Sequence, residues 1–171
     1  FTVKLSMPGQ PLNTNATAIT LNDTSISTAG GAASGSGSVG DGGNILISDP
    51  LTLSNGTTTI NTGTGGGTVS FGAAIETNGG DNDLLVVTSG TGNVTFTGAI
   101  GATNELGGLS VNASSGDRDI TFTSTIGDAD NAGVIGTTAV GNSTTADLNF
   151  SSTIYKFDGG TTFTAASDAT M

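Results

Sequence analysis

The chain of 171 residues contains no cysteine, no histidine and no tryptophan. Without cysteine it can form no disulfide and no thiolate metal site. Only Lys4, Arg118 and Lys156 are positively charged, against 14 acidic residues, so the net charge is −11. Three cations cannot follow a phosphate backbone, and an anionic membrane surface repels an acidic protein. The charge therefore excludes nucleic acid and such membranes as expected partners.

Long hydrophobic runs are also missing. No stretch of 18 apolar residues occurs, so the sequence predicts no membrane-spanning helix. The chain opens on Phe1 rather than Met, and no signal peptide is visible. We expect it to be a mature protein or an excerpt from a longer chain.

Charged residues make up only 10% of the chain and aromatic residues 5%. An average soluble domain has about 25% charged residues. Glycine, with 29 residues, and threonine, with 31, are abundant instead. Low charge would suit a disordered chain only if apolar residues were scarce and unpatterned. Here valine, isoleucine, leucine and phenylalanine recur at regular intervals, which predicts an ordered fold.

The regular feature is a heptapeptide with apolar residues at its first, third and seventh positions. Its clearest copy is Ile-Thr-Phe-Thr-Ser-Thr-Ile, residues 120–126. Other copies begin at Ile45, Val69, Val94 and Leu148, and a looser copy begins at Ile19 with Ile26 as its last apolar residue. These starting positions predict an internal repeat with a period of about 25 residues.

A second apolar element follows each heptapeptide by about nine residues. These elements are Thr57–Ile60, Leu84–Val87, Leu109–Val111, Thr138–Val140 and Thr161–Thr164. No segment shows the apolar spacing of a helix, and turn residues come every few positions. Each repeat is therefore expected to run strand, corner, strand, corner. In the clearest copy, Ile120, Phe122 and Ile126 should face inward, and Thr121 and Thr123 outward.

Short strands with regular turns fit either a β-sandwich or a β-solenoid. A sandwich has no reason to repeat one heptapeptide six times, whereas stacked coils place each copy on the next. We therefore predict an all-β fold, a parallel β-helix of about six coils of about 25 residues each. Right-handed crossovers are the strong default. Residues 1–17 should form an amino-terminal strand, cap or junction, because Pro8 and Pro11 interrupt the pattern, and residues 18–171 the solenoid.

Acidic residues after the heptapeptides are the candidates for a cation site. Their carboxylates should gather at one corner of the solenoid, and calcium prefers such oxygen ligands. The recurring G-G-x-G-x-D pattern of calcium-binding β-rolls is absent, so ordinary solvated turns are the competing interpretation. The candidate ligands are Asp81, Asp83, Glu105, Asp128 and Asp130.

Two columns of polar residues have structural interpretations. The residues before each heptapeptide, Asn44, Thr68, Asn93, Asp119 and Asp147, should hydrogen-bond along one corner. The outward residues Thr20, Ser70, Thr95, Thr121 and Asn149 resemble the threonine ladders of β-helical ice-binding proteins, although Leu46 and Gly72 interrupt them. Threonine is favoured in strands in any case.

Catalysis has little support in the residue types. Parallel β-helices include enzymes that act on polysaccharides, and such sites need clustered carboxylates with basic or aromatic neighbours. This chain has one arginine, one tyrosine and no histidine. We therefore predict a protein that is not an enzyme and needs no cofactor, with calcium as the one ion considered.

Residues 92–101, Gly-Asn-Val-Thr-Phe-Thr-Gly-Ala-Ile-Gly, and 106–112, Leu-Gly-Gly-Leu-Ser-Val-Asn, resemble the repeats of filamentous-haemagglutinin-like adhesins and related giant bacterial surface proteins. The resemblance covers residues 45–165 and is clearest over 69–126. It implies a secreted or cell-surface rod or fibre that mediates attachment. Its partners would be neighbouring repeats, copies of itself, or host and matrix glycans and proteins.

Three further functions stay open beside this one. The chain could be a self-assembling sheath, filament or surface-layer subunit, and more distant alternatives are a polysaccharide-acting enzyme and an ice-binding protein.

Overall fold

The computed structural model describes residues 3–30, 42–79, 83–113 and 118–170. All regular elements in these ranges are β-strands, and no helix occurs among them. The strands form three sheets in which neighbouring strands run parallel. The prediction of an all-β, parallel β-solenoid is confirmed.

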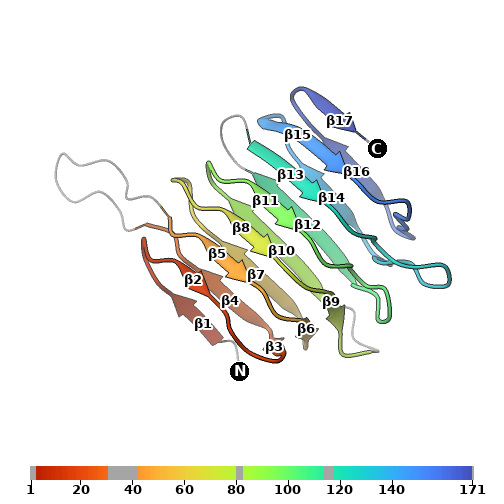
Figure 1. Ribbon diagram of the computed structural model, residues 1–171, viewed down its shortest axis with the longest axis horizontal. Helices are drawn as coiled ribbons and strands as arrows, with labels where there is room; N and C mark the ends of the chain where they lie inside the picture. The colour runs from red at the N-terminus through yellow and green to blue at the C-terminus, as the bar shows by residue number, and fades with distance from the viewer. Residues whose placement is uncertain (1–2, 31–41, 80–82, 114–117, 171) are drawn as a thin grey trace.

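Two sheets of seven strands form the long sides of the molecule. Each takes its strands from successive coils, so that strands distant in sequence lie side by side (Figure 1). Sheet A contains, in order, β1 (Val3–Ser6), β4 (Thr24–Ser27), β7 (Thr57–Asn61), β10 (Leu84–Ser89), β12 (Gly108–Ala113), β14 (Thr138–Gly141) and β16 (Thr161–Thr164). Sheet B contains, in order, β2 (Leu12–Asn13), β5 (Ile45–Ile47), β8 (Val69–Phe71), β11 (Val94–Phe96), β13 (Arg118–Phe122), β15 (Thr145–Phe150) and β17 (Asp168–Thr170).

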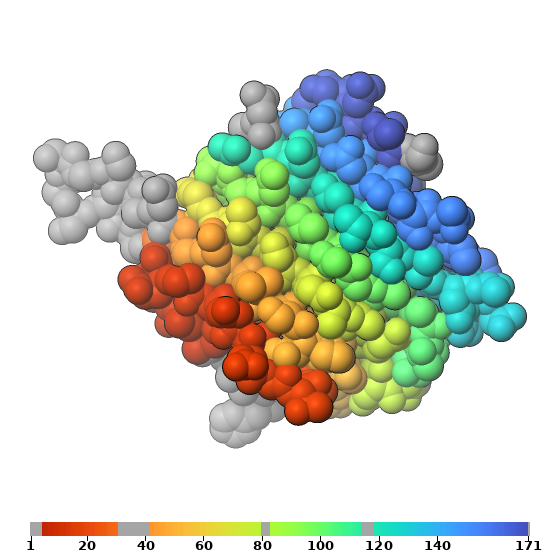
Figure 2. Space-filling view, viewed as in Figure 1, coloured from red at the N-terminus to blue at the C-terminus, as the bar shows by residue number. Residues whose placement is uncertain are grey.

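A third, shorter side of the coil was not predicted. Sheet C consists of β3 (Ile19–Asn22), β6 (Leu51–Ser54) and β9 (Ile75–Thr77). Single parallel bridges extend it through Ile100 and Ile126 to Tyr155. The seventh residue of the heptapeptide thus starts a new side of the coil. Figure 2 shows the coils as successive bands, with the first at one end and the last at the other.

Identical or similar apolar residues stack on one another in the interior, as the repeat predicts. Val69, Val94 and Ile120 are register partners in sheet B. Two residues further on, the rings of Phe71, Phe96, Phe122 and Phe150 lie parallel, with centroids 4.9, 4.8 and 5.1 Å apart. This separation matches the roughly 4.8 Å between hydrogen-bonded strands. The backbone ladder therefore sets the spacing of the aromatic stack.

The first predicted heptapeptide copy, beginning at Ile19, is wrong in its alignment. Ile19 pairs with Leu51 in sheet C, and Leu12 occupies the place beside Ile45 in sheet B. Residues 1–17 therefore supply β1 and β2, the end strands of sheets A and B. The alignment failed because apolar residues alternate in the same way in strands of all three sheets.

A second correction concerns the heptapeptide copy that begins at Leu148, whose seventh residue, Ile154, was expected to face inward like Ile126 in the clearest copy. Tyr155 instead continues the column of Ile75, Ile100 and Ile126 and packs against the core. Tyr155 follows Phe150 by five residues, whereas Ile126 follows Phe122 by four. Because of this extra residue, the side chain of Tyr155, rather than that of Ile154, occupies the interior position that Ile126 has in the preceding coil.

Candidate functional site

The acidic residues predicted as cation ligands lie on the segments that lead from the sheet C side to sheet A. Asp83 precedes β10, Glu105 precedes β12, and Asp128 and Asp130 precede β14. Asp81 lies outside the described residues. Among the residues that are described, no three acidic side chains are close enough to share a metal ion.

Asp83 is the most buried of these candidates, with 1% of its surface exposed. Its Oδ1 accepts a hydrogen bond from the Gly56 N–H of the preceding coil at 2.5 Å. Its backbone oxygen accepts a bond from the Gly107 N–H of the following coil at 2.8 Å. Asp83 therefore links three successive coils. Its Oδ2 is buried and accepts no hydrogen bond from the described residues.

Glu76, in strand β9 of sheet C, also binds backbone through its carboxylate. Glu76 Oε2 accepts hydrogen bonds from the N–H groups of Thr103 at 3.1 Å and Asn104 at 2.8 Å, both in the next coil. The Glu105 carbonyl oxygen accepts a bond from the Thr77 hydroxyl at 3.0 Å. These contacts give the corner a structural function, because they satisfy backbone groups that no strand pairs.

Asp128 closes the turn before β14. Its Oδ1 accepts hydrogen bonds from the N–H groups of Asp130 at 2.8 Å and Asn131 at 2.7 Å. These bonds, from Asn131 first and then Asp130, lower the pKa of the Asp128 carboxyl, and Lys156 adds a smaller effect in the same direction. Lys156 Nζ also donates to the Ala129 carbonyl oxygen at 2.5 Å, while Asp130 is exposed.

The column before the heptapeptide holds one corner of sheet B together. The side-chain oxygen of Asn44 accepts the Thr68 N–H at 2.9 Å, and that of Asn93 accepts the Asp119 N–H at 3.2 Å. The predicted hydrogen bonding along this corner is thus present at two steps. In both hydrogen bonds the donor N–H belongs to the later coil and the acceptor side chain to the preceding coil.

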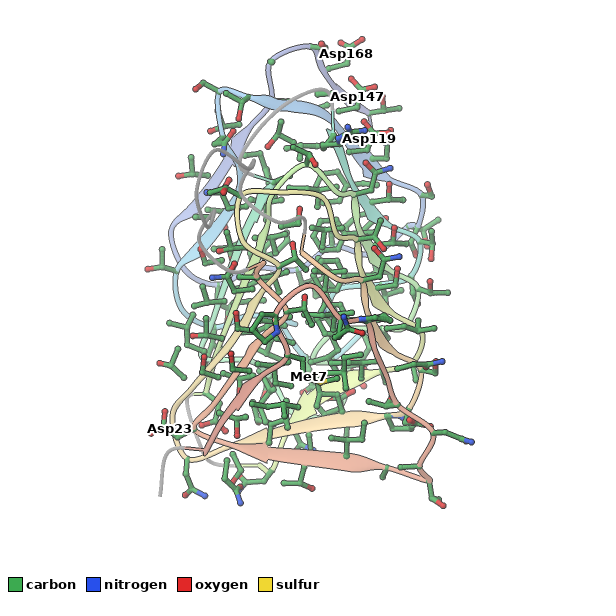
Figure 3. The ribbon with its side chains drawn as sticks, turned by 90° about the vertical axis from the view of Figure 1, so that its left-hand side faces the viewer. Met7, Asp23, Asp119, Asp147 and Asp168 are labelled. Carbon is green, nitrogen blue, oxygen red and sulfur yellow. The ribbon has the colours of Figure 1, made fainter. Side chains whose placement is uncertain are left out.

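Towards the carboxyl end this column becomes acidic. Asp147 is the direct register partner of Asp168, and Figure 3 shows Asp119, Asp147 and Asp168 one above another along the same edge. Sequence reasoning found Asp119 and Asp147 but missed Asp168. The segment around Asp168 lacks the heptapeptide pattern, so only the strand pairing of β17 places it here.

The outward threonine columns are partly as predicted. Ser70, Thr95, Thr121 and Asn149 are register partners on the outer face of sheet B. Thr20 belongs instead to sheet C, beside Thr52. In the next column the Thr123 hydroxyl donates to the Phe96 carbonyl oxygen at 3.2 Å, so this hydroxyl is already used within the protein. The ordered outer surface is therefore smaller than the predicted ladder.

No pocket is found over the part of the chain that the structure describes. None of the described segments is a helix that could cross a membrane. No family model, no curated protein and no solved structure matches this chain. The arrangement of the described residues thus offers outer sheet faces and corners, rather than a cavity, as surfaces for contact.

Proposed function

We propose that this chain is a structural and adhesive segment of a large secreted or cell-surface bacterial β-solenoid protein, and that it forms part of a rod or fibre used for attachment. The observation that carries the proposal is the continuous stacking through the molecule. Backbone ladders on two sides and the column of four phenylalanine rings join coil to coil. Such a stack lengthens by one strand spacing for each added coil, which suits a spacer that holds a binding surface away from a cell.

The outer face of sheet A suits contact with a neutral partner. From β4 to β16 its strands contain no Asp, Glu, Lys or Arg, although the whole chain has a net charge of −11. The described acids lie in corners, in β9 of sheet C, in the acidic column of sheet B or near the carboxyl end. A glycan or matrix protein could therefore approach sheet A without meeting the acidic corners.

The proposal is tested on intact cells of the source organism. Antibodies against the 171-residue chain should label cells without permeabilisation, and an in-frame deletion of residues 45–165 should reduce adherence to matrix-coated surfaces at least tenfold. A strain carrying Thr121→Ala, which changes only an outward residue, serves as the control and should adhere normally. Labelling that requires permeabilisation, or full adherence of the deletion strain, would contradict the proposal.

A self-assembling sheath or surface-layer subunit is the second candidate, favoured by the same uncharged face of sheet A. Identical chains could pack laterally through it without charge repulsion. Electron microscopy of the purified chain distinguishes the candidates. A regular lattice of identical chains would favour assembly, and separate particles would favour the adhesive segment.

A further inference from the structure

The sequence contains two Asn-Gly pairs, Asn55-Gly56 and Asn78-Gly79, and the fold places them at the ends of two neighbouring strands. The first pair directly follows β6, and the second directly follows β9, which pairs with β6 in sheet C. Both asparagines are exposed. Asparagine followed by glycine is especially prone to deamidation, because glycine has no Cβ to shield its backbone nitrogen. The same reactive sequence therefore occurs twice, in adjacent coils.

Deamidation of such a pair proceeds through the glycine nitrogen. This nitrogen loses its proton to water and attacks the side-chain carbonyl carbon of the asparagine, so that a C–N bond forms. The bond to the side-chain nitrogen breaks, and ammonia leaves after taking up a proton from water. Water then opens the cyclic imide to aspartate or isoaspartate. A hydrogen bond from the glycine N–H opposes the first step, because it must break before the nitrogen can react.

The side-chain amides of the two asparagines have the same partner. Asn55 Nδ2 and Asn78 Nδ2 each donate a hydrogen bond to the Ser54 hydroxyl oxygen at 2.8 Å. Ser54 is buried, so this oxygen is shared between the two coils. Because the leaving nitrogen is held alike in both pairs, it gives no reason for different rates of reaction.

The glycine nitrogens, in contrast, are held differently. The Gly56 N–H donates to Asp83 Oδ1 at 2.5 Å, and the Gly56 carbonyl oxygen accepts the Leu84 N–H at 3.1 Å. Asp83 is buried, so water competes poorly for its carboxylate. The Gly79 N–H donates to none of the residues that the structure describes, and Gly79 is exposed. The nitrogen that must react is therefore held in the first pair and free of protein partners in the second.

We infer that Asn78 is a site of spontaneous deamidation in the folded protein, and that Asp83 protects Asn55 from the same reaction. The product at position 78 has no Nδ2 to donate to Ser54, and its isoaspartate form adds a main-chain carbon atom at the end of β9. We expect the modified chain to melt at a lower temperature, since a buried hydroxyl loses its donor. This inference does not depend on the adhesive function proposed above.

Incubation of the folded protein at mildly alkaline pH, followed by peptide mapping with tandem mass spectrometry, measures both reactions in one sample. Asn78 should deamidate at least about tenfold faster than Asn55, because the bond from Gly56 to a buried carboxylate protects the first pair. In urea that unfolds the chain the two rates should converge, since both pairs then have the same local chemistry. Circular dichroism establishes the folded and the unfolded state.

The variant Asp83→Ala tests the protecting contact. It frees the Gly56 N–H, so Asn55 should deamidate at a rate close to that of Asn78. Asp128→Ala is the matched control, because the Asp128 carboxylate binds only N–H groups of its own turn, and it should leave both rates as in the wild type. Thermal melts establish that each variant is folded. If Asp83→Ala does not fold, the wild-type rates with and without urea decide alone.

Three results would overturn the inference. The first is a folded wild type in which Asn78 stays unmodified or reacts no faster than Asn55. The second is a difference between the two rates that persists in urea, because the local sequence and not the fold would then cause it. The third is folded Asp83→Ala in which Asn55 reacts as slowly as in the wild type.

Discussion

At the scale of single residues, Phe122 lies between two parallel rings, 4.8 Å from that of Phe96 and 5.1 Å from that of Phe150. Its side chain is 1% exposed. Removing it takes away burial for three coils at once, because each ring of the stack covers the next. The neighbouring Thr121 lies on the outer face of the same strand. Comparing substitutions at Phe122 and Thr121 therefore distinguishes a loss of core packing from a general effect on the strand.

We expect Phe122→Ala to lower the free energy of unfolding by about 3–5 kcal/mol, the usual cost of a buried phenylalanine truncated to alanine. Thr121→Ala should change it by less than about 0.5 kcal/mol, as surface substitutions do. Urea denaturation of both variants measures the two values. Equal effects would show that the ring stack does not support the core.

Gly92 shows how closely the corners of successive coils approach. An ideal Cβ built on Gly92 would overlap the Gly67 carbonyl oxygen of the preceding coil. Because the overlapping atom belongs to the backbone, a rotamer change cannot relieve the clash. We expect Gly92→Ala to destabilise the protein by about 1–3 kcal/mol, the usual cost of overpacking.

Gly160 is the matched control for this prediction. Its ideal Cβ has no other heavy atom within 4 Å. Gly160→Ala should therefore leave the melting temperature unchanged or raise it slightly, since alanine restricts the unfolded chain. If Gly92→Ala and Gly160→Ala had the same melting temperature, the close approach of the Gly67 carbonyl oxygen would not be the reason for glycine at position 92.

At the scale of elements, the parallel ladder places equivalent positions side by side whether their side chains attract or repel each other. The same register that superimposes phenylalanines places Asp147 directly beside Asp168. Directly opposed like charges destabilise a sheet by roughly 0.2–1 kcal/mol. The last two strands of sheet B are thus joined less firmly than those in the middle of the sheet.

We expect Asp147→Asn to raise the free energy of unfolding by about 0.2–1 kcal/mol at low salt. The gain should shrink as ionic strength rises, because salt screens the repulsion. Asp158→Asn removes the same charge from an exposed residue whose N–H bonds to the Val134 carbonyl oxygen, and it should have a smaller effect. Denaturation at low and high salt measures both. A stabilisation of Asp147→Asn that does not depend on salt would contradict the explanation.

At the scale of the whole molecule, each coil contacts only its neighbours in the stack. Stability in such a protein is approximately a sum over coils and their interfaces, so the ends are weaker than the middle. Strand β11 lies between β8 and β13, whereas β17 pairs, among the described strands, with β15 alone, and all three of its residues are exposed.

Hydrogen exchange should follow this gradient. We expect the amides of β11 and its neighbours β8 and β13 to exchange most slowly, and those of β17 to exchange at least a hundredfold faster. Exchange followed by NMR or mass spectrometry resolves these strands. Equal protection of β11 and β17 would mean that the molecule opens only as a whole.

The sequence alone predicts the all-β solenoid, the sheet A strands from β7 to β16 and the stacking of the phenylalanines, but it misses β4. These features follow from a period that is visible in the residues, because stacked coils place equivalent positions on one another. The inward direction of Ile120, Phe122 and Ile126 could likewise be predicted, since alternation in a strand is a local property. All three are buried.

The sheet that each short strand joins depends on contacts between distant segments. Ile19–Asn22 has the alternation of the heptapeptide, but its ladder partner is β6 in sheet C. One extra residue in the last coil placed Tyr155 where Ile154 was expected. Pairing alone brought Asp168 to Asp147 and Leu12 to Ile45. These outcomes depend on the lengths of the corners and on contacts between distant segments, which a local pattern of apolar residues does not encode.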